Sequence, residues 1–461
     1  MGKKCYSYFY KSSLFQRKEK FLFMSNITLE QVFGISKDQV LSYYQRLRVD
    51  GLLQEALKSD KQIIVYGSSK QGKTALVDKH VPYKNNIVIS LSPIMTIRDI
   101  YRSILNNLNV ELISEIESRT AEEATISVGA RVKAMLPFIA GGDASIDSEL
   151  KSTTEDKIKK TPIEINIELP NDIATIIKKL GTGRFVILEN FHYLTDEMQK
   201  RLAFDLRSFQ ELGVRFIILG VWREKNRLTQ FNGDLLDRII EVPVEPWQKE
   251  EFRAVIENGS KYLNIKFHED LINEVTESAF DSIGVVQELI KSICKLKNIV
   301  VKQAAIVQVD DKELVKVAIS EKVQDYSSRH TRALESIAEG RKSTGPSKDG
   351  LVPLYLPYYT VKAFLSFPFD EVVSGIRRGR LETEIKKHHH RSEDVRPSDM
   401  GNLLNNLALL QSEKKIVPPI FDYDQATKTI RVVDSTFYFF LRNVDRQDVL
   451  KNINDPTEER D

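Results

Sequence analysis

The sequence predicts an α/β protein whose first half is built on a parallel β-sheet, and three observations support this. Short apolar segments have the length of buried strands, at 62–66, 87–91, 185–188, 216–219 and 239–242. Segments with a helical spacing of apolar residues separate most of these strands, and a glycine-rich loop follows the first strand. Continuous apolar strands that alternate with helices are typical of a sheet covered on both faces. Such sheets bind ligands at the carboxyl ends of their strands, so the chemistry is expected there.

Composition excludes several other classes of protein. The 461 residues allow roughly two to four domains, and 41% apolar with 29% charged residues is typical of a soluble globular protein with a core. A formal charge of +2 predicts neither a general nucleic-acid coat nor an acidic partner. Cys5 and Cys294 are too few for a disulfide framework. No apolar run approaches the roughly 18 residues that span a bilayer, so a cytoplasmic location is expected.

Residues 1–37 are interpreted as an amino-terminal tail and lead-in. The first 23 residues are basic and rich in aromatic side chains. A membrane-surface tail, acylated at Gly2 or Cys5, is one interpretation, but Tyr6 stands where a myristoylation signal has Ser or Thr. The other interpretation is an unstructured tail or upstream extension with Met24 as the natural start, and we favour it.

The sheet-containing region is expected to cover 38–246. Apolar residues at helical spacing predict one or two helices over 38–58, before the first strand. Thr96 is placed to cap a later helix. The segment 115–170 interrupts the pattern, because 125–134 and 163–169 alternate with period two. A β-hairpin or strand-rich excursion and a flexible loop both stay open for this segment.

The remainder of the chain is expected to be mostly helical. Apolar stripes predict helices over 250–263, 270–279, 285–296 and about 311–340, and the breaker-rich 341–350 predicts a linker. A separate unit is expected over 351–446. Its predicted elements are helices over 358–367 and 369–378, one opened by Ser398, strands over 415–421 and 429–433 joined by a turn, and a final helix over 435–442.

The glycine-rich loop after the first strand has the spacing of a phosphate-binding P-loop. Its backbone N–H groups would form an anion nest at the start of a helix, where the helix dipole adds to the attraction. Lys73 would reach the β- and γ-phosphates of ATP, and the Thr74 hydroxyl would bind Mg²⁺. The predicted nucleotide-binding residues are Gly67, Ser68, Ser69, Lys70, Gln71, Gly72, Lys73 and Thr74.

A P-loop also needs an acid that serves the metal ion and a group that positions the attacking water. Glu189 directly follows the apolar strand 185–188 and is the candidate for the metal side. Asn190 occupies the next position and cannot accept a proton, so binding is better supported than fast hydrolysis. Asp196 or Glu197 could substitute for the missing acid, although both are more simply interpreted as caps of the next helix.

On these residues the chain resembles the AAA+ and STAND branch of P-loop ATPases, in which four hydrophobic residues are followed by two acids. The resemblance covers about 280 residues and implies an ASCE/AAA+-type P-loop sheet with a helical lid over 247–340. It implies a sensor-like role for Arg223 and a role for Arg238 at a neighbouring subunit's γ-phosphate. A surface ion pair between Asp237 and Arg238 is the equally weighted alternative. Gln287 stands where the family's second sensor is usually Arg.

The carboxyl-terminal unit resembles a winged helix, a module that follows the lid in origin-recognition initiators and many STAND ATPases. DNA contact is slightly favoured over protein docking because the stretch is basic and opposed by only two acids, Glu382 and Glu384. Its basic residues are Arg377, Arg378, Arg380, Lys386, Lys387 and Arg391. A solvated basic stretch is preferred to a metal site for the three histidines at 388–390.

Together these features predict an ATP-binding switch or assembly platform with slow hydrolysis, ATP and Mg²⁺ as cofactors, and a homo-oligomer or partner complex. The resemblance implies a bacterial DNA-associated process such as phage defence, mobile-element targeting or replication control. The alternative is a non-enzymatic DNA-binding or adaptor protein with a structural nucleotide. Cys294 lies on an apolar helix stripe and is interpreted as a core residue.

Overall fold

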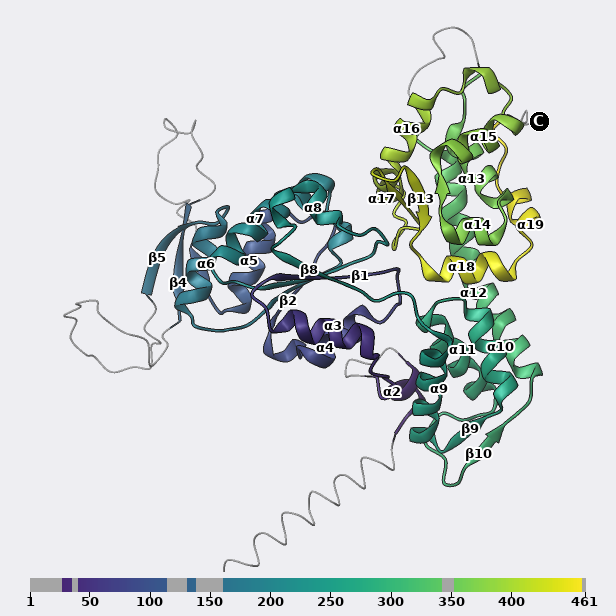
Figure 1. Cartoon of the computed structure of the whole chain (residues 1–461), viewed down its shortest axis with the longest axis horizontal. Helices are drawn as coiled ribbons and strands as arrows, with labels where there is room; N and C mark the ends of the chain where they lie inside the picture. The colour runs from purple at the N-terminus through teal and green to yellow at the C-terminus, as the bar shows by residue number, and fades with distance from the viewer. Residues whose placement is uncertain (1–26, 35–39, 114–130, 138–160, 342–351, 458–461) are drawn as a thin grey trace, which may run out of the picture. The chain divides into compact units, whose positions relative to one another are not determined.

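The computed structural model describes residues 27–34, 40–113, 131–137, 161–341 and 352–457 (Figure 1). The chain forms two compact units. The first contains the described parts of Met1–Asp50, Gly67–Lys79 and Val244–Asp461, and the second contains Gly51–Tyr66 and the described parts of His80–Pro243.

Three predictions fall mainly outside the described residues. They are the amino-terminal tail with Gly2, Cys5 and Met24, the centre of the 115–170 excursion, and most of the 341–350 linker.

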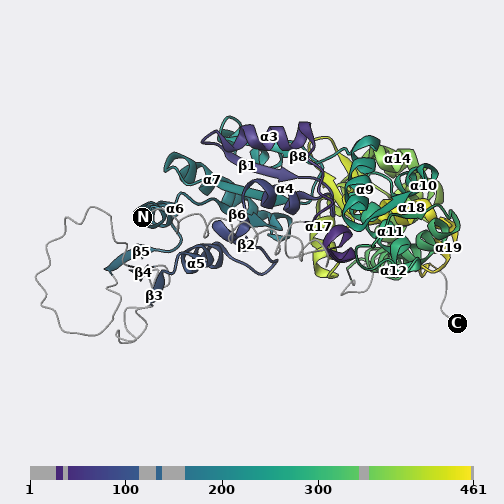
Figure 2. The same cartoon turned by 90° about the horizontal axis from the view of Figure 1, so that it is seen from below.

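A five-stranded parallel sheet forms the centre of the second unit (Figures 1 and 2). Its order is β2-β6-β7-β1-β8, so β7 lies between the strand that precedes the P-loop and the strand that ends in Glu189. Each neighbouring pair is parallel. The strands are β1 (Gln62–Tyr66), β2 (Ile87–Ser90), β6 (Val186–Glu189), β7 (Phe216–Gly220) and β8 (Ile239–Pro243). The α/β fold class and the five predicted strands are therefore confirmed.

Helices α5 (Ile97–Asn107), α6 (Pro170–Lys179) and α7 (Asp196–Glu211) pack together on this sheet, in one core with its strands (Figure 1). Thr96 begins α5 with a capping box, as the sequence predicts. The cap of α7 is Thr195 and not Asp196 or Glu197, because the Thr195 hydroxyl accepts the Met198 N–H while both acids lie in the first turn. Shorter elements complete the unit: η1 (Tyr83–Asn85), η2 (Phe191–Tyr193), α8 (Arg227–Phe231) and η3 (Gly233–Leu235).

The interrupting segment contributes two of the three strands of a separate antiparallel sheet in the second unit. The sheet consists of β3 (Glu111–Ile113), β4 (Arg131–Leu136) and β5 (Thr161–Asn166), in the order β3-β4-β5. Lys133 pairs with Glu164 across β4 and β5, while Ala134 and Ile165 are buried. Antiparallel pairing with one buried face agrees with the period-two pattern of the sequence.

The lid region belongs to the first unit and has its own core. Its elements are α2 (Leu29–Phe33), α9 (Lys249–Leu263), β9 (Ile265–Phe267), α10 (Glu269–Ala279), α11 (Ile283–Leu296), β10 (Val307–Val309) and α12 (Glu313–Glu339). Gly259 lets α9 approach Phe33 of α2, since a Cβ there would lie 2.1 Å from the ring. Cys294 is fully buried in this core, and burial raises the pKa of its thiol to about 12. It is a core residue.

The long helix α12 joins two cores of the first unit (Figure 1). Val315 and Ala318 near its start belong to the lid core. Leu334 and Ile337 near its end belong to the core of the carboxyl-terminal elements. One continuous helix therefore carries the chain from the lid into the last part of the protein.

The carboxyl-terminal part combines helices with a three-stranded antiparallel sheet of order β11-β13-β12. Its elements are α13 (Leu356–Ser366), α14 (Phe369–Ser374), β11 (Ile376–Arg377), α15 (Arg378–His388), η4 (Ser392–Asp394), α16 (Pro397–Asn405), α17 (Leu407–Glu413), β12 (Phe421–Asp424), β13 (Thr429–Val432), α18 (Ser435–Asn443) and α19 (Arg446–Lys451).

Two predictions in this part are wrong. The strand predicted over 415–421 begins only at Phe421, because Pro418 and Pro419 have no N–H to donate to a ladder. The helix predicted over 369–378 ends at Ser374, because Gly375 adopts φ +87° and stops it. The basic stretch that follows is itself a helix, α15.

Candidate nucleotide-binding site

The backbone of the P-loop depends on its glycines. Gly67 and Gly72 have φ of +153° and +80°, and Lys70 between them has φ +55°. A Cβ on Gly67 would lie 2.6 Å from Cγ2 of Val244, so a side chain there is excluded. Helix α4 (Lys73–His80) begins at Lys73. The loop therefore has the strand-before, helix-after context that an anion nest needs.

Lys73 is held by its own loop. Its Nζ donates to the carbonyl oxygens of Gly67 at 2.9 Å and Ser68 at 2.6 Å. Burial lowers the pKa of Lys73 to about 8, and the nearby Glu245 opposes this effect. Both partners are neutral carbonyls, and among the described residues no ion pair joins Lys73 to a carboxylate.

Glu245 fixes the beginning of the loop, although sequence reasoning did not single it out. One of its carboxylate oxygens accepts the Ser68 N–H at 2.7 Å, and the other accepts the Gln71 side-chain amide at 3.1 Å. Gln71 also donates to the carbonyl of Asp281, and the Lys70 carbonyl accepts the Gly284 N–H at 3.1 Å. These contacts tie the loop to the segment after β8 and to the lid.

Arg46 and Trp247 lie beside the loop and were also missed. The Arg46 guanidinium stacks 3.8 Å from the centre of the Trp247 ring and donates to the Val244 carbonyl at 2.7 Å. A Cβ on Gly72 would be 3.8 Å from Trp247. Burial lowers the pKa of Arg46. The only sequence signal for this pair was a tryptophan directly after Pro246, where the sheet region ends.

Ser69 joins the P-loop to the carboxyl-terminal part of the chain. Its N–H donates to the Val433 carbonyl at 2.9 Å, and its hydroxyl donates to Asp434 at 3.0 Å. Ser435 returns two hydrogen bonds, from its N–H to the Ser69 hydroxyl and from its own hydroxyl to the Ser69 carbonyl at 2.7 Å. All of these groups are buried, and Ser435 is the first residue of α18.

Asp434 is the centre of this junction. Its side chain caps α18 by accepting from the N–H and hydroxyl of Thr436, and it forms an ion pair with Arg329 of α12 at 2.6 Å. Burial alone would raise the pKa of Asp434, but the charge of Arg329, the hydrogen bonds from Thr436 and Arg329, and His330 wherever it is protonated lower it overall. A buried carboxylate with these partners stays ionised.

His330 lies against the same helix end. It is fully buried, it is within hydrogen-bond distance of the Thr436 hydroxyl at 3.1 Å, and burial lowers its pKa to about 4. It is therefore neutral near pH 7. In the lid, Gln287 donates to the Ser42 hydroxyl at 3.3 Å and carries no charge.

Within the second unit, Glu189 and Asn190 have different partners. Glu189 ends β6, and one of its carboxylate oxygens accepts a hydrogen bond from the Tyr83 hydroxyl at 2.7 Å. Asn190 has a left-handed backbone with φ +61°, and its amide donates to the hydroxyl of Ser90 at 3.0 Å. Because β1 and β6 are parallel, Glu189 and the end of β1 that continues into the P-loop lie at the same edge of the sheet.

Arg223 and Arg238 also lie in the second unit. Arg223 follows the end of β7 by three residues. Arg238 directly precedes β8, donates to the Gln210 side chain at 2.6 Å and forms an ion pair with Glu211 at 3.0 Å. Both partners come from α7, and among the described residues Arg238 forms no ion pair with Asp237.

The residues present fit a nucleotide with magnesium. No group of three or more His, Cys, Asp or Glu side chains that could hold a metal occurs among the residues that the structure describes. Mg²⁺ usually needs no such cage, because one or two protein oxygens, waters and the nucleotide phosphates complete its shell. The sequence predicts the Thr74 hydroxyl, in the first unit, and the Glu189 carboxylate, in the second unit, as ligands, and each is an oxygen donor of the kind that Mg²⁺ prefers.

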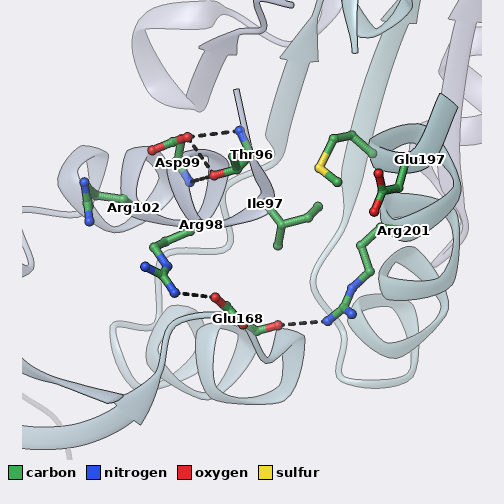
Figure 3. A pocket seen from close by; sticks show the side chains of 9 residues that line it. Thr96, Ile97, Arg98, Asp99, Arg102, Glu168, Glu197 and Arg201 are labelled. Atoms are coloured by element: carbon green, nitrogen blue, oxygen red, sulfur yellow. Dashed lines mark hydrogen bonds and ion pairs between the residues drawn. The ribbon is translucent and has the colours of Figure 1, made fainter. Parts of the chain in front are cut away.

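The second unit contains a further cavity of about 580 Å³ away from the P-loop sequence (Figure 3). Arg98 and Arg201 both contact Glu168, through its carboxylate and its backbone carbonyl respectively. Asp99 is engaged in the capping box with Thr96. Three arginines and three acids line the cavity, so their formal charges cancel and no ligand charge is favoured.

The predicted basic patch of the carboxyl-terminal part is largely neutralised. The sequence analysis counted two acids, Glu382 and Glu384, against the basic residues. Glu371 and Asp394 add to this neutralisation through ion pairs with Arg380 and Arg391. Lys386 pairs with Glu382, and Lys387 pairs with Glu384. His389 is buried with its Nε2 2.7 Å from the Leu354 carbonyl, so the histidines are not simply solvated.

Comparisons with known proteins concern the fold. No protein-family model matches the sequence, and no curated protein matches it. A Walker-type ATPase of Pyrococcus abyssi is 14% identical, with 87% of this chain and 96% of that chain covered at a TM-score of 0.44. The ORC2 protein of Aeropyrum pernix, solved as ADPNP–ADP complexes, is 13% identical, with 93% and 98% covered at 0.42. The RuvB Holliday junction branch migration motor of Thermotoga maritima is 10% identical, with 85% and 93% covered at 0.35.

Similarity at this level carries no argument about family or role. The structure itself shows a five-stranded parallel sheet with the glycine-rich loop directly after β1, followed in the chain by a mostly helical region, as the sequence predicts. In the part of the chain that the structure describes, no helix has the length and apolarity of a membrane span.

Proposed function

We propose that this protein is an ATP-dependent switch of the AAA+/STAND type, in which nucleotide at the P-loop controls the carboxyl-terminal part of the chain. The proposal of a switch rests on one set of contacts. The P-loop residue Ser69 exchanges buried hydrogen bonds with Val433, Asp434 and Ser435 at the start of α18. A loop that changes when phosphate binds would act on α18 directly through these bonds, because each of them joins loop atoms to the helix end.

Hydrolysis in this proposal is slow. Asn190 takes the place of the second acid, and its amide is already bonded to Ser90. An amide can orient water but cannot take its proton, so the reaction lacks a strong general base at this position. Arg223 and Arg238 keep the sensor and inter-subunit roles that the resemblance implies, with assembly through Arg238 as part of the proposal.

Nucleotide binding is tested with Lys73→Ala. Equilibrium binding of a fluorescent ATP analogue to the full chain should weaken at least about 100-fold, because a buried charged hydrogen-bond donor is worth about 3 kcal/mol. Lys84→Ala changes an exposed lysine outside the loop and is the matched control. An affinity of the Lys73→Ala variant equal to that of the wild type contradicts the proposal.

The switch is tested by amide hydrogen exchange in 435–443 with and without ATP and Mg²⁺. We expect nucleotide to change exchange in α18 of the wild type and to leave it unchanged in Lys73→Ala. Light scattering under the same conditions tests nucleotide-dependent assembly. Tight binding without any change in α18, in particle size or in turnover would support the alternative, a protein with a structural nucleotide.

DNA contact by a winged-helix-like carboxyl-terminal part is a second candidate. Arg377 and Lys428 support it, since both are exposed and neither side chain forms an ion pair or hydrogen bond within the described residues. They are neighbours in space, because β11 pairs with β13 at Arg377 and Thr429, and the Arg378 N–H donates to the Lys428 carbonyl at 2.8 Å. A DNA-associated process, including phage defence, mobile-element targeting or replication control, is proposed on this basis.

A further inference from the structure

Tyr83 is a residue that neither the motif nor the family resemblance assigns. Its hydroxyl donates a hydrogen bond of 2.7 Å to one oxygen of the Glu189 carboxylate, within the second unit. Tyr83 lies in the short helix η1, between α4 and β2, and is partly exposed. Glu189 ends the neighbouring strand β6, where the sequence places the metal-side acid.

The backbone around Tyr83 is held firmly. Pro82 precedes it with φ −53°, and the Asn86 N–H donates to the Tyr83 carbonyl. The Asn86 side chain donates to the Pro82 carbonyl at 2.8 Å and accepts the Phe185 N–H at 3.0 Å. Phe185 directly precedes β6, so the turn that carries Tyr83 is bonded to the strand that carries Glu189.

The pairing of strands adds to this restraint. Residues of β2 and β6 are in register from Ile87 with Val186 to Ser90 with Glu189. Asn190 is turned toward Ser90 by its left-handed backbone and its hydrogen bond. Glu189 is therefore the acid that this strand end presents, and the Tyr83 hydroxyl holds one of its two oxygens.

We infer that Tyr83 is a positioning residue that orients the Glu189 carboxylate for the Mg²⁺ that accompanies the nucleotide. This inference rests on the proposed function. A carboxylate that serves a metal has several rotamers, and a hydrogen bond to one oxygen selects the rotamer and directs the other oxygen. Loss of such an outer partner typically costs about 10- to 100-fold in metal affinity or activity.

The experiment compares Tyr83→Phe with the wild-type full chain. Affinity for a fluorescent, slowly hydrolysed ATP analogue is measured in EDTA and across a Mg²⁺ titration. We expect unchanged affinity in EDTA and a Mg²⁺ midpoint raised about 10-fold, because the phenol donates its 2.7 Å hydrogen bond to the metal-side acid. Glu189→Gln should remove most of the response to Mg²⁺.

Tyr101→Phe is the matched control. It removes another phenol–carboxylate hydrogen bond of the second unit, the 2.6 Å bond from Tyr101 to the buried Asp205. This variant should lose stability and keep the wild-type Mg²⁺ midpoint. Equal shifts in Tyr83→Phe and Tyr101→Phe would overturn the inference, and so would an unchanged or lowered midpoint in Tyr83→Phe.

Failure of this inference is distinguishable from failure of the proposed function. If Lys73→Ala binds the analogue as well as the wild type, the P-loop assignment itself fails. If Lys73→Ala loses binding while Tyr83→Phe has the wild-type Mg²⁺ response, only the role of Tyr83 fails. A wild-type affinity that does not respond to Mg²⁺ overturns the role of Tyr83 as well.

Discussion

The sequence predicts anion binding both at the phosphate loop and at helix α15, but the positive side chains of the two regions have different partners. Lys73 donates to two carbonyl oxygens of its own loop. On α15, Arg380, Lys386 and Lys387 each pair with a carboxylate. Carbonyl oxygens carry no net charge, so the charge of Lys73 stays available to a phosphate, whereas carboxylates cancel the charge of the helix.

This difference shows that a P-loop motif is stronger evidence for anion binding than a count of basic residues. A P-loop binds phosphate through backbone geometry, which a few residues fix locally, and its lysine adds to a site that is already positive. A basic stretch binds DNA through net charge, and any acid that folds against it reduces that charge. Counting basic residues in one stretch of sequence misses the acids that come from elsewhere in the fold.

The largest expected difference is in the loss of stability when a buried acid and an exposed acid are each replaced by alanine. Asp434→Ala leaves Arg329 without its partner and the start of α18 without its cap, so the free energy of unfolding should fall by about 3–5 kcal/mol. Asp394→Ala removes the partner of Arg391 at a site where Asp394 is 52% exposed, and should cost less than about 1 kcal/mol. Chemical denaturation of both variants checks this, and equal losses would break the comparison.

The buried side of the comparison also predicts a pH dependence. Burial lowers the pKa of His330 from its ordinary 6.5 to about 4, with Asp434, Arg329 and Lys70 as the charged groups that face it. Because the folded value is the lower one, protonation favours the unfolded chain. The stability that depends on neutral His330 should therefore be fully present above pH 6.5. The free energy of unfolding should fall by about 3 kcal/mol as the pH is lowered from 6.5 to 4.

Chemical denaturation of the wild type and His330→Gln between pH 7.5 and pH 4 measures this contribution as the difference between their profiles. Other groups that titrate in the range contribute to both profiles and cancel. Parallel profiles for the two proteins would contradict the prediction.

The smallest expected effects are on DNA affinity, and they test which basic residues of the carboxyl-terminal part are available to bind phosphate. Changing Arg377 and Lys428 together to Ala should weaken binding to duplex DNA about tenfold and reduce the slope of log affinity against log salt by about 2. Changing Lys386 and Lys387 together should alter affinity less than about twofold, because each is paired with a carboxylate. Titrations at several salt concentrations test both, and the reverse order would show that the ion pairs of α15 open on binding.

Much of the fold follows from local patterns. The five apolar strands, the helices of the lid, and the P-loop between β1 and α4 were predicted because each depends on neighbours a few residues away. The two wrong predictions in the carboxyl-terminal part also depended on local sequence. Pro418 and Pro419 exclude a strand, and Gly375 ends a helix, so the sequence held the information in both cases.

The candidate site was predictable only in part. The loop, Glu189 and Asn190 come from motifs, but Glu245, Arg46 and Tyr83 have no motif and were found through their contacts. The hydrogen-bond partners described above for these three residues are 106 to 198 positions away in the sequence. Nothing in the local sequence marks a tyrosine before β2 as the partner of an acid at the end of β6.

The sequence alone determined that a phosphate loop forms, because two glycines and a strand-to-helix junction fix its backbone. Tertiary structure decided what each charge near that loop does. Ser69 meets Asp434 across 365 positions, and the acids that neutralise α15 include one from another helix. The physical reason is that backbone conformation is a local property, whereas electrostatic compensation depends on which side chains folding brings within hydrogen-bonding distance.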